Sequence, residues 1–130
     1  MFIDTSVIVA ILSGEDDAAR WAGRIEQSAI RVTSPLVVLE AVMRLSTKLL
    51  VEPAETEAAI AQFLAEAGIE VVSINPADGN LAVRAFAAFG KGRGHPAQLN
   101  LADCLSYACA KGRGLSLLYK GNDFAQTDLA

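Results

Sequence analysis

Short apolar runs alternate with longer segments of helical periodicity along the chain. The runs at 2–4, 30–33, 69–74 and 115–119 consist mostly of aliphatic and β-branched residues and predict strands. The segments 7–12, 16–27, 36–50, 54–67, 76–89 and 101–111 predict helices. Strands that alternate with helices predict an α/β fold, in which helices flank both faces of a mainly parallel sheet.

Residues that favour helix N-caps stand before several of the predicted helices. Thr5 or Ser6 is expected to cap the first helix, and Ser34 the third, where Pro35 takes the first helical position. Asn100 is expected to cap the last helix. The stretch 90–98, rich in Gly, Lys and Arg, is the one long irregular connection, and we expect it to contact substrate.

The helix predicted at 36–50 carries large apolar side chains at helical spacing, which predicts the face that packs on the core. These residues are Leu36, Leu39, Met43 and Leu50. Glu40 lies beside this face and one turn before Arg44.

The composition predicts one packed domain over residues 1–130, because 52% of the residues are hydrophobic and 20% are charged. No apolar stretch approaches the roughly 20 residues that cross a bilayer, and no leader pattern is visible, so we expect a cytoplasmic protein. Cys104 and Cys109 are five residues apart in a predicted helix and are expected to be buried thiols. With His95 as the single histidine, a zinc site is disfavoured.

Charge is distributed unevenly along the chain, although the net charge is only -4. Residues 1–80 contain five Lys and Arg against twelve Asp and Glu, whereas residues 81–122 contain six Lys and Arg against Asp103 alone. Each of these basic side chains, taken singly, fits a solvated helix end or loop. Together they indicate a side of the molecule that faces phosphates.

Four carboxylates stand where this fold would gather them. Asp4 ends the first predicted strand, and Asp123 follows the last, so both lie beyond the carboxyl ends of strands, where open α/β sheets bind ligands. Glu40 and Asp103 would reach the same place from neighbouring helices. Three of the four lie among apolar neighbours, where an ionised carboxylate is costly without a compensating cation. A hard divalent cation is the natural partner and indicates phosphate chemistry.

Each acid also has an ordinary structural interpretation. Asp4 fits a helix cap, Glu40 a pair with Arg44, Asp103 the favourable first turn of a helix, and Asp123 a Gly-Asn-Asp turn. Four separate explanations do not account for the apolar surroundings, whereas one shared Mg²⁺ or Mn²⁺ does.

At these acids the chain resembles a PIN-domain ribonuclease, specifically a VapC-type toxin of a type II toxin-antitoxin pair. The resemblance covers nearly the whole chain. The segments that carry it are Phe2-Ile3-Asp4-Thr5-Ser6, Glu40, 94–104 (GHPAQLNLADC) and 120–124 (KGNDF), with Thr127-Asp128 behind.

The resemblance implies a PIN-like fold with a central parallel sheet of four or five strands flanked by helices, and endonucleolytic cleavage of RNA. It implies that Asp4, Glu40, Asp103 and Asp123 surround Mg²⁺ or Mn²⁺. Ser6 would be an auxiliary polar group, and Asn122 stands where relatives often carry another acid, which weakens a second metal position. The resemblance further implies a homodimer, as in many members of the family, and inhibition by an antitoxin whose tail enters the acidic site or its groove.

The resulting hypothesis is a metal-dependent endoribonuclease. Asp4 and Asp103 are its principal metal ligands, and Glu40 and Asp123 complete the site directly or through waters. The side chains expected to hold RNA phosphates are Lys91, Arg93, Lys111 and Arg113. His95 is expected to order its loop, since a metal-activated water needs no histidine base.

Two other functions remain open from the sequence. A phosphatase of the haloacid dehalogenase type would use Asp4 as nucleophile, but that chemistry favours a second acid two residues later, where Ser6 stands. A catalytically silent module would use the basic third of the chain to bind RNA or a partner protein. Cleavage of RNA with added magnesium separates these hypotheses.

Overall fold

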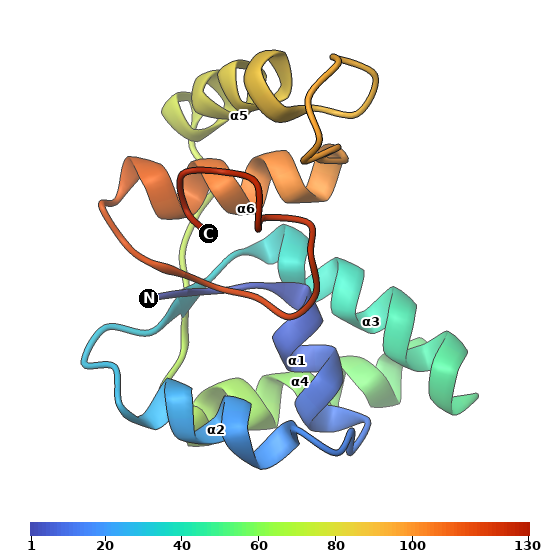
Figure 1. Ribbon diagram of the computed structural model, residues 1–130. Helices are drawn as coiled ribbons and strands as arrows, with labels where there is room; N and C mark the ends of the chain where they lie inside the picture. The colour runs from blue at the N-terminus through green and yellow to red at the C-terminus, as the bar shows by residue number, and fades with distance from the viewer.

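The computed structural model describes residues 1–130 and contains four short strands and six helices (Figure 1). The strands are β1 (Phe2–Ile3), β2 (Val32–Thr33), β3 (Glu70–Val71) and β4 (Leu117–Leu118). They form one sheet in the order β3-β2-β1-β4, and every neighbouring pair is parallel. The predicted α/β fold is confirmed, and its parallel sheet has four strands where four or five were expected.

The six helices form two groups on either side of the strands. Their bounds are α1 (Thr5–Leu12), α2 (Ala18–Glu26), α3 (Pro35–Leu49), α4 (Pro53–Ala67), α5 (Pro76–Phe89) and α6 (Leu101–Gly112). Figure 1 shows α5 stacked on α6 on one side of the strands, with α1, α2 and α4 on the other. Helix α3 contacts α1 and α4 along its length and also reaches α6.

The first helix begins at Thr5, two residues earlier than predicted, and its cap lies one residue before the expected candidates. Asp4, not Thr5 or Ser6, is the N-cap of α1, and its carboxylate accepts a hydrogen bond from the N–H of Ser6. Asp4 has extended backbone and an acceptor side chain, so it satisfies an amide that the helix leaves unpaired. Ser34 and Asn100 cap α3 and α6 as predicted.

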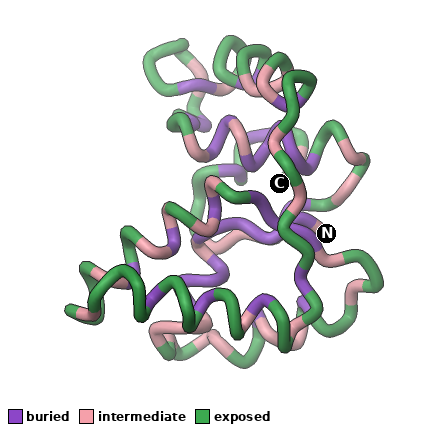
Figure 2. Tube along the Cα trace, turned by 180° about the vertical axis from the view of Figure 1, so that it is seen from behind, coloured by how far each residue is buried: buried purple, intermediate pink, exposed green.

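The core lies around the strands and the inner faces of the helices, where Figure 2 shows most of the buried chain. The predicted inner face of α3 is wrong. Its buried residues are Val37, Ala41 and Leu45, whereas Leu39 and Met43 are 55% and 61% exposed. This stripe of α3 packs on α1 and α4.

Each strand is shorter than its apolar run predicts. The run at 30–33 pairs only at Val32–Thr33, and Ile30 is 58% exposed. The run at 69–74 pairs only at Glu70–Val71, where both residues are exposed at the sheet edge. The central strands β1 and β2 are as short as the edge strands β3 and β4.

A loop at 90–99 joins α5 to α6. The N–H of Lys91 donates to the carbonyl of Leu99, and the N–H of Leu99 donates to the carbonyl of Phe89, both at 2.9 Å. Gly90 has no room for a side chain, because a Cβ there would lie 2.3 Å from Cδ1 of Phe86. The two hydrogen bonds hold the end of α5 next to the residues that precede α6.

The burial of the two cysteines was predicted from the sequence. Cys104 and Cys109 are both buried and unbonded, as predicted. No helix is at once long enough and apolar enough to span a bilayer.

Candidate active site

Asp4 lies at the centre of the sheet's carboxyl edge. It follows β1, and its N–H donates to the carbonyl of Leu118 at the end of β4. Its Oδ2 accepts hydrogen bonds from the N–H of Ser6 at 3.1 Å and from Oγ of Ser6 at 2.7 Å. Asp4 is only 6% exposed, and Oδ1 takes part in no hydrogen bond within the protein. One carboxylate oxygen is thus fixed, and the other is available to a ligand.

Asp103 occupies the third position of α6 and is 8% exposed. Its Oδ2 accepts a hydrogen bond of 3.1 Å from the N–H of Asn100, while its own N–H donates to Oδ1 of Asn100 at 2.9 Å. This reciprocal cap holds the side chain at the helix start. As with Asp4, the second oxygen is not hydrogen-bonded.

Glu40 and Asp123 are less enclosed. Glu40 lies half-buried in α3, and Asp123 is exposed in the turn after β4, beside the exposed Asn122. Neither acid forms an ion pair, so the alternative interpretation of Glu40 as a partner of Arg44 is not borne out. The five ion pairs of the protein involve none of the four acids.

The pKa of Asp103 reflects its burial and the charges of the other three acids. The pKa of Asp103 is raised to about 7. Burial is the largest cause, the hydrogen bond from the N–H of Asn100 opposes it, and the negative charges of Asp123, Asp4 and Glu40 contribute to the increase. The fold therefore brings the four acids within electrostatic range of one another, although they come from four separate parts of the sequence.

Asp78 provides a matched comparison inside the same molecule. It occupies the third position of α5, forms the same reciprocal cap with Asn75, and is 4% exposed. Burial by itself would raise the pKa of Asp78, but hydrogen bonds from Arg113 and from the N–H of Asn75 outweigh it and leave the pKa below its ordinary value. Two acids in the same local structure thus differ in one respect: Asp78 has a cationic partner and Asp103 faces three anions.

The donor set fits a hard divalent cation by its chemistry. It consists of carboxylate oxygens without an intervening cysteine or histidine, and such oxygens are the ligands that Mg²⁺ and Mn²⁺ prefer. A cation would relieve the repulsion at Asp103 that no lysine or arginine neutralises. As placed, no three acidic, histidine or cysteine side chains form a ready-made cage, so the side chains would have to turn toward a bound ion.

Comparisons with known proteins identify the family of this chain. A family model described as the PIN domain matches residues 1–129. Ribonuclease VapC28 of Mycobacterium tuberculosis is 42% identical over 127 residues, covering 98% of this chain and 93% of the relative. A VapC ribonuclease of Rhizobium meliloti is 40% identical over 139 residues, covering 98% of both chains.

This chain belongs to the PIN-domain family, among the VapC ribonucleases.

Solved structures with low sequence identity share the fold of this PIN domain. A structure titled as a toxin-antitoxin complex from Klebsiella pneumoniae has a TM-score of 0.72 at 17% identity, covering 98% of this chain and 92% of that one. The sarcin-ricin loop cleaving toxin VapC20 of Mycobacterium tuberculosis has a TM-score of 0.71 at 17% identity, covering 95% and 92%.

The four basic side chains expected to bind RNA fall into two groups. Lys91 and Arg93 are exposed on the loop between α5 and α6 and form no ion pair, and the Arg93 guanidinium lies 5.7 Å from the ring centre of Phe86. Lys111 pairs with Asp128 at 2.6 Å, and Arg113 pairs with Asp78. The second group would have to leave these partners to bind RNA.

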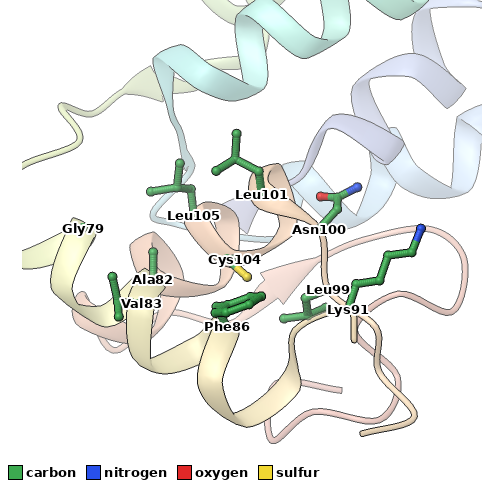
Figure 3. A pocket seen from close by; sticks show the side chains of 10 residues that line it. All are labelled: Gly79, Ala82, Val83, Phe86, Lys91, Leu99, Asn100, Leu101, Cys104 and Leu105. Atoms are coloured by element: carbon green, nitrogen blue, oxygen red, sulfur yellow. The ribbon is translucent and has the colours of Figure 1, made fainter. Parts of the chain in front are cut away.

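His95 is held in its loop by a hydrogen bond and a ring contact, and a groove lies between α5 and α6. Nδ1 of His95 accepts a hydrogen bond of 3.1 Å from the N–H of Ala97, and its ring meets Phe89 edge-on. Between α5 and α6 a mainly apolar groove of about 530 Å³ has Phe86 on its wall and Lys91 and Asn100 among its lining residues (Figure 3). Because Asn100 is hydrogen-bonded to Asp103, this groove begins next to the acidic site.

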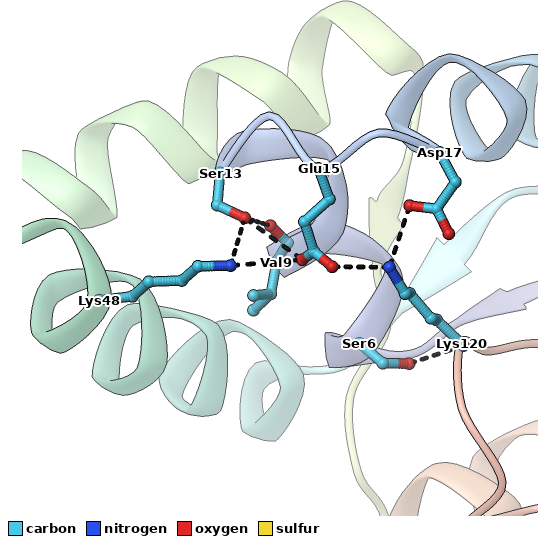
Figure 4. Close-up of polar contacts among 7 residues, drawn as sticks. All are labelled: Ser6, Val9, Ser13, Glu15, Asp17, Lys48 and Lys120. Atoms are coloured by element: carbon cyan, nitrogen blue, oxygen red, sulfur yellow. Dashed lines mark hydrogen bonds and ion pairs between the residues drawn. The ribbon is translucent and has the colours of Figure 1, made fainter.

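Sequence reasoning did not identify one polar cluster of this PIN domain. Lys120 donates to Glu15 and to Asp17, and Lys48 reaches Glu15 from α3 (Figure 4). The only sequence signal was the acidic run at 15–17 near the start of the chain. Nothing in that run predicts that its partner is Lys120, more than a hundred residues away.

Proposed function

We propose that the protein is a metal-dependent endoribonuclease that acts as the toxin of a type II toxin-antitoxin pair. The contrast between Asp78 and Asp103 carries the proposal. The same capped, buried aspartate is neutralised by Arg113 in one helix and surrounded by three acids in the other. A protein that needed Asp103 only as a helix cap would gain nothing from that repulsion. The names of the relatives, VapC ribonucleases, support the same function.

In the proposed site Asp4 and Asp103 are the principal ligands of Mg²⁺ or Mn²⁺, and Glu40 and Asp123 complete it directly or through waters. The burial of Asp4 and Asp103 supports this division, because the two acids that are less enclosed are freer to adjust. When bound, the cation would polarise the scissile phosphodiester and lower the pKa of the attacking water. Ser6 orients Asp4 by donating to it, and Asn122 offers an uncharged oxygen beside Asp123.

The RNA backbone is proposed to run past the loop at 90–99. Arg113 remains paired with the buried Asp78, whereas Lys91 and Arg93 would bind phosphates there and Lys111 would contribute where it exchanges Asp128 for RNA. These contacts position the strand without reading its sequence.

The proposed partners are an antitoxin and a second copy of the chain, in the cytoplasm. A solved structure of similar fold is titled as a toxin-antitoxin complex, which supports the first. Leu39 and Met43, four residues apart on the exposed side of α3, support the second, because large apolar side chains in a row are costly to leave in water. Met43→Glu should shift a dimer to monomer in light scattering after gel filtration. A wild-type protein that is monomeric at all concentrations contradicts the dimer.

The activity is tested with the purified full-length chain, a panel of RNAs, and Mg²⁺ or Mn²⁺. Asp4→Asn and Asp103→Asn should abolish cleavage while the circular dichroism spectrum is kept. Glu55→Gln, an exposed acid of α4 without an ion pair, is the matched control and should cut like wild type. Full metal-dependent cleavage by Asp4→Asn would contradict the assignment.

The same assay separates the rival functions. A silent binding module would retain the RNA without cutting it, and a phosphatase would turn over small phosphomonoesters instead. Sequencing the 5′ ends of RNA fragments after induced expression would then identify the RNA that is cut.

A further inference from the structure

Lys120 lies between β4 and the turn that carries Asp123. Its Nζ donates to Oε1 of Glu15 at 2.6 Å and to Oδ1 of Asp17 at 3.0 Å (Figure 4). Glu15 and Asp17 lie in the connection from α1 to α2. The ammonium thus joins the C-terminal turn to a segment near the start of the chain.

The main chain of Lys120 is also fixed, and the acceptor is part of the proposed site. Its N–H donates to Oγ of Ser6 at 3.0 Å, and that hydroxyl donates in turn to Oδ2 of Asp4 at 2.7 Å. A hydroxyl has one proton to give and lone pairs to accept with, so Ser6 serves both neighbours at once. The position of Lys120 is therefore linked directly to that of Asp4.

The turn that follows has few attachments of its own. No hydrogen bond joins the side chain of Asn122 or Asp123 to the rest of the protein, and Gly121 has a φ of +100° that belongs to a tight turn. Phe124, 1% exposed, anchors the far end by packing on Tyr119. Asp123 thus lies between two fixed points, Lys120 before it and Phe124 after it.

We propose that Lys120 is a positioning residue, whose ion pairs with Glu15 and Asp17 hold the segment carrying Asp123 beside Asp4, so that both acids reach one divalent cation. This inference rests on the proposed function. Lys120 itself does not touch the cation or the RNA. Its charge is already matched by two carboxylates, which sets it apart from the unpaired Lys91 and Arg93.

The decisive variant is Lys120→Met in the full-length protein, which removes the charge and keeps a stem of similar length. We expect the affinity for Mn²⁺, measured by calorimetry without RNA, to fall roughly tenfold, as is typical when support of a metal ligand is removed. We also expect faster amide hydrogen exchange at residues 119–124 in the metal-free protein. Lys120→Arg, which keeps the charge, should restore most of both.

Lys48→Met is the matched control. It removes a second cation from the same Glu15, at 3.5 Å, without touching the segment that carries Asp123. Its Mn²⁺ affinity and its exchange at 119–124 should equal those of wild type.

The double variant Glu15→Gln with Asp17→Asn separates positioning from direct binding of RNA. If Lys120 positions Asp123, this variant should weaken Mn²⁺ binding as Lys120→Met does. A tighter RNA complex with unchanged Mn²⁺ affinity would overturn the inference, because a released Lys120 would then be a phosphate ligand.

The Mn²⁺ affinities also separate failure of this inference from failure of the proposed function. If wild type binds Mn²⁺ and Lys120→Met binds it equally well, the positioning role is overturned and the proposed function stands. If wild type binds no Mn²⁺, the proposed function and the positioning role are overturned together.

Discussion

The guanidinium of Arg113 binds both carboxylate oxygens of Asp78, with Nη1 to Oδ1 at 2.9 Å and Nη2 to Oδ2 at 3.1 Å. The pair joins the start of α5 to the end of α6. The side chain of Asp78 is only 5% exposed and that of Arg113 25%, so the pair is largely shielded from solvent. Arg113 also donates to the carbonyls of Ser73 and Cys109, which adds two further hydrogen bonds to the guanidinium.

Removing one partner of this pair should destabilise the fold strongly. Arg113→Met leaves Asp78 buried without its cation, and we expect the free energy of unfolding to fall by about 3 kcal/mol. Urea unfolding at pH 7 measures the change. Arg24→Met, an exposed arginine of α2 without an ion pair, is the control and should change it by less than about 0.5 kcal/mol. A decrease as small as that of the control would show that the pair is not shielded.

The same pair should make stability depend on acid pH. The pKa of Asp78 is lower in the folded protein than its ordinary value, so the unfolded chain binds this proton first as the pH falls. The stabilisation is therefore complete above about pH 4 and disappears as the pH falls through the folded pKa. The free energies of unfolding of wild type and Asp78→Asn, plotted against pH, should converge below about pH 4. A difference that stays constant with pH would contradict the assignment.

Asp103→Asn should stabilise the metal-free protein while it abolishes cleavage. The amide oxygen still accepts the hydrogen bond from the N–H of Asn100, but the buried charge that faces three acids is gone. We expect the free energy of unfolding in EDTA at pH 8 to rise on the order of 1 kcal/mol, as is common when a strained functional group is removed. A lower melting temperature than wild type would mean that the four acids do not repel one another. Glu55→Gln should leave the melting temperature unchanged.

Lys91→Gln together with Arg93→Gln should weaken RNA binding without changing the rate of cleavage at saturating RNA. Binding is measured at several salt concentrations on Asp4→Asn, which does not cut. The slope of log affinity against log salt should become shallower by about 0.7 for each phosphate that the protein no longer neutralises. Arg24→Gln should leave the slope unchanged. A slope that stays the same in the double variant would place the RNA elsewhere.

The order of the elements was predictable because caps and apolar runs are local signals. Ser34 and Asn100 each accept the hydrogen bond that their position in the sequence predicts. The inner face of α3 was not predictable, because the helix carries two apolar stripes and only packing selects Val37 rather than Leu39.

The candidate site was also predictable only as far as neighbours in the sequence reveal it. Apolar neighbours marked three of the four acids as unusual, and the fold brings all four within electrostatic range of one another. Asp78 and Asp103 look alike in the sequence, since each follows an asparagine by three residues. Only the three-dimensional position of Arg113 distinguishes the neutralised acid from the repelled one.

Asp4 is the only residue between the end of β1 and the beginning of α1. A strand fixes the chain before Asp4 and a helix fixes it after, so no loop residues can accommodate an inserted or deleted residue. Inserting or deleting one residue here would rotate the carboxylate away from Asp103, because successive strand residues point to opposite faces. Engineered variants can therefore change the identity of this side chain, but the number of residues around it has to stay as it is.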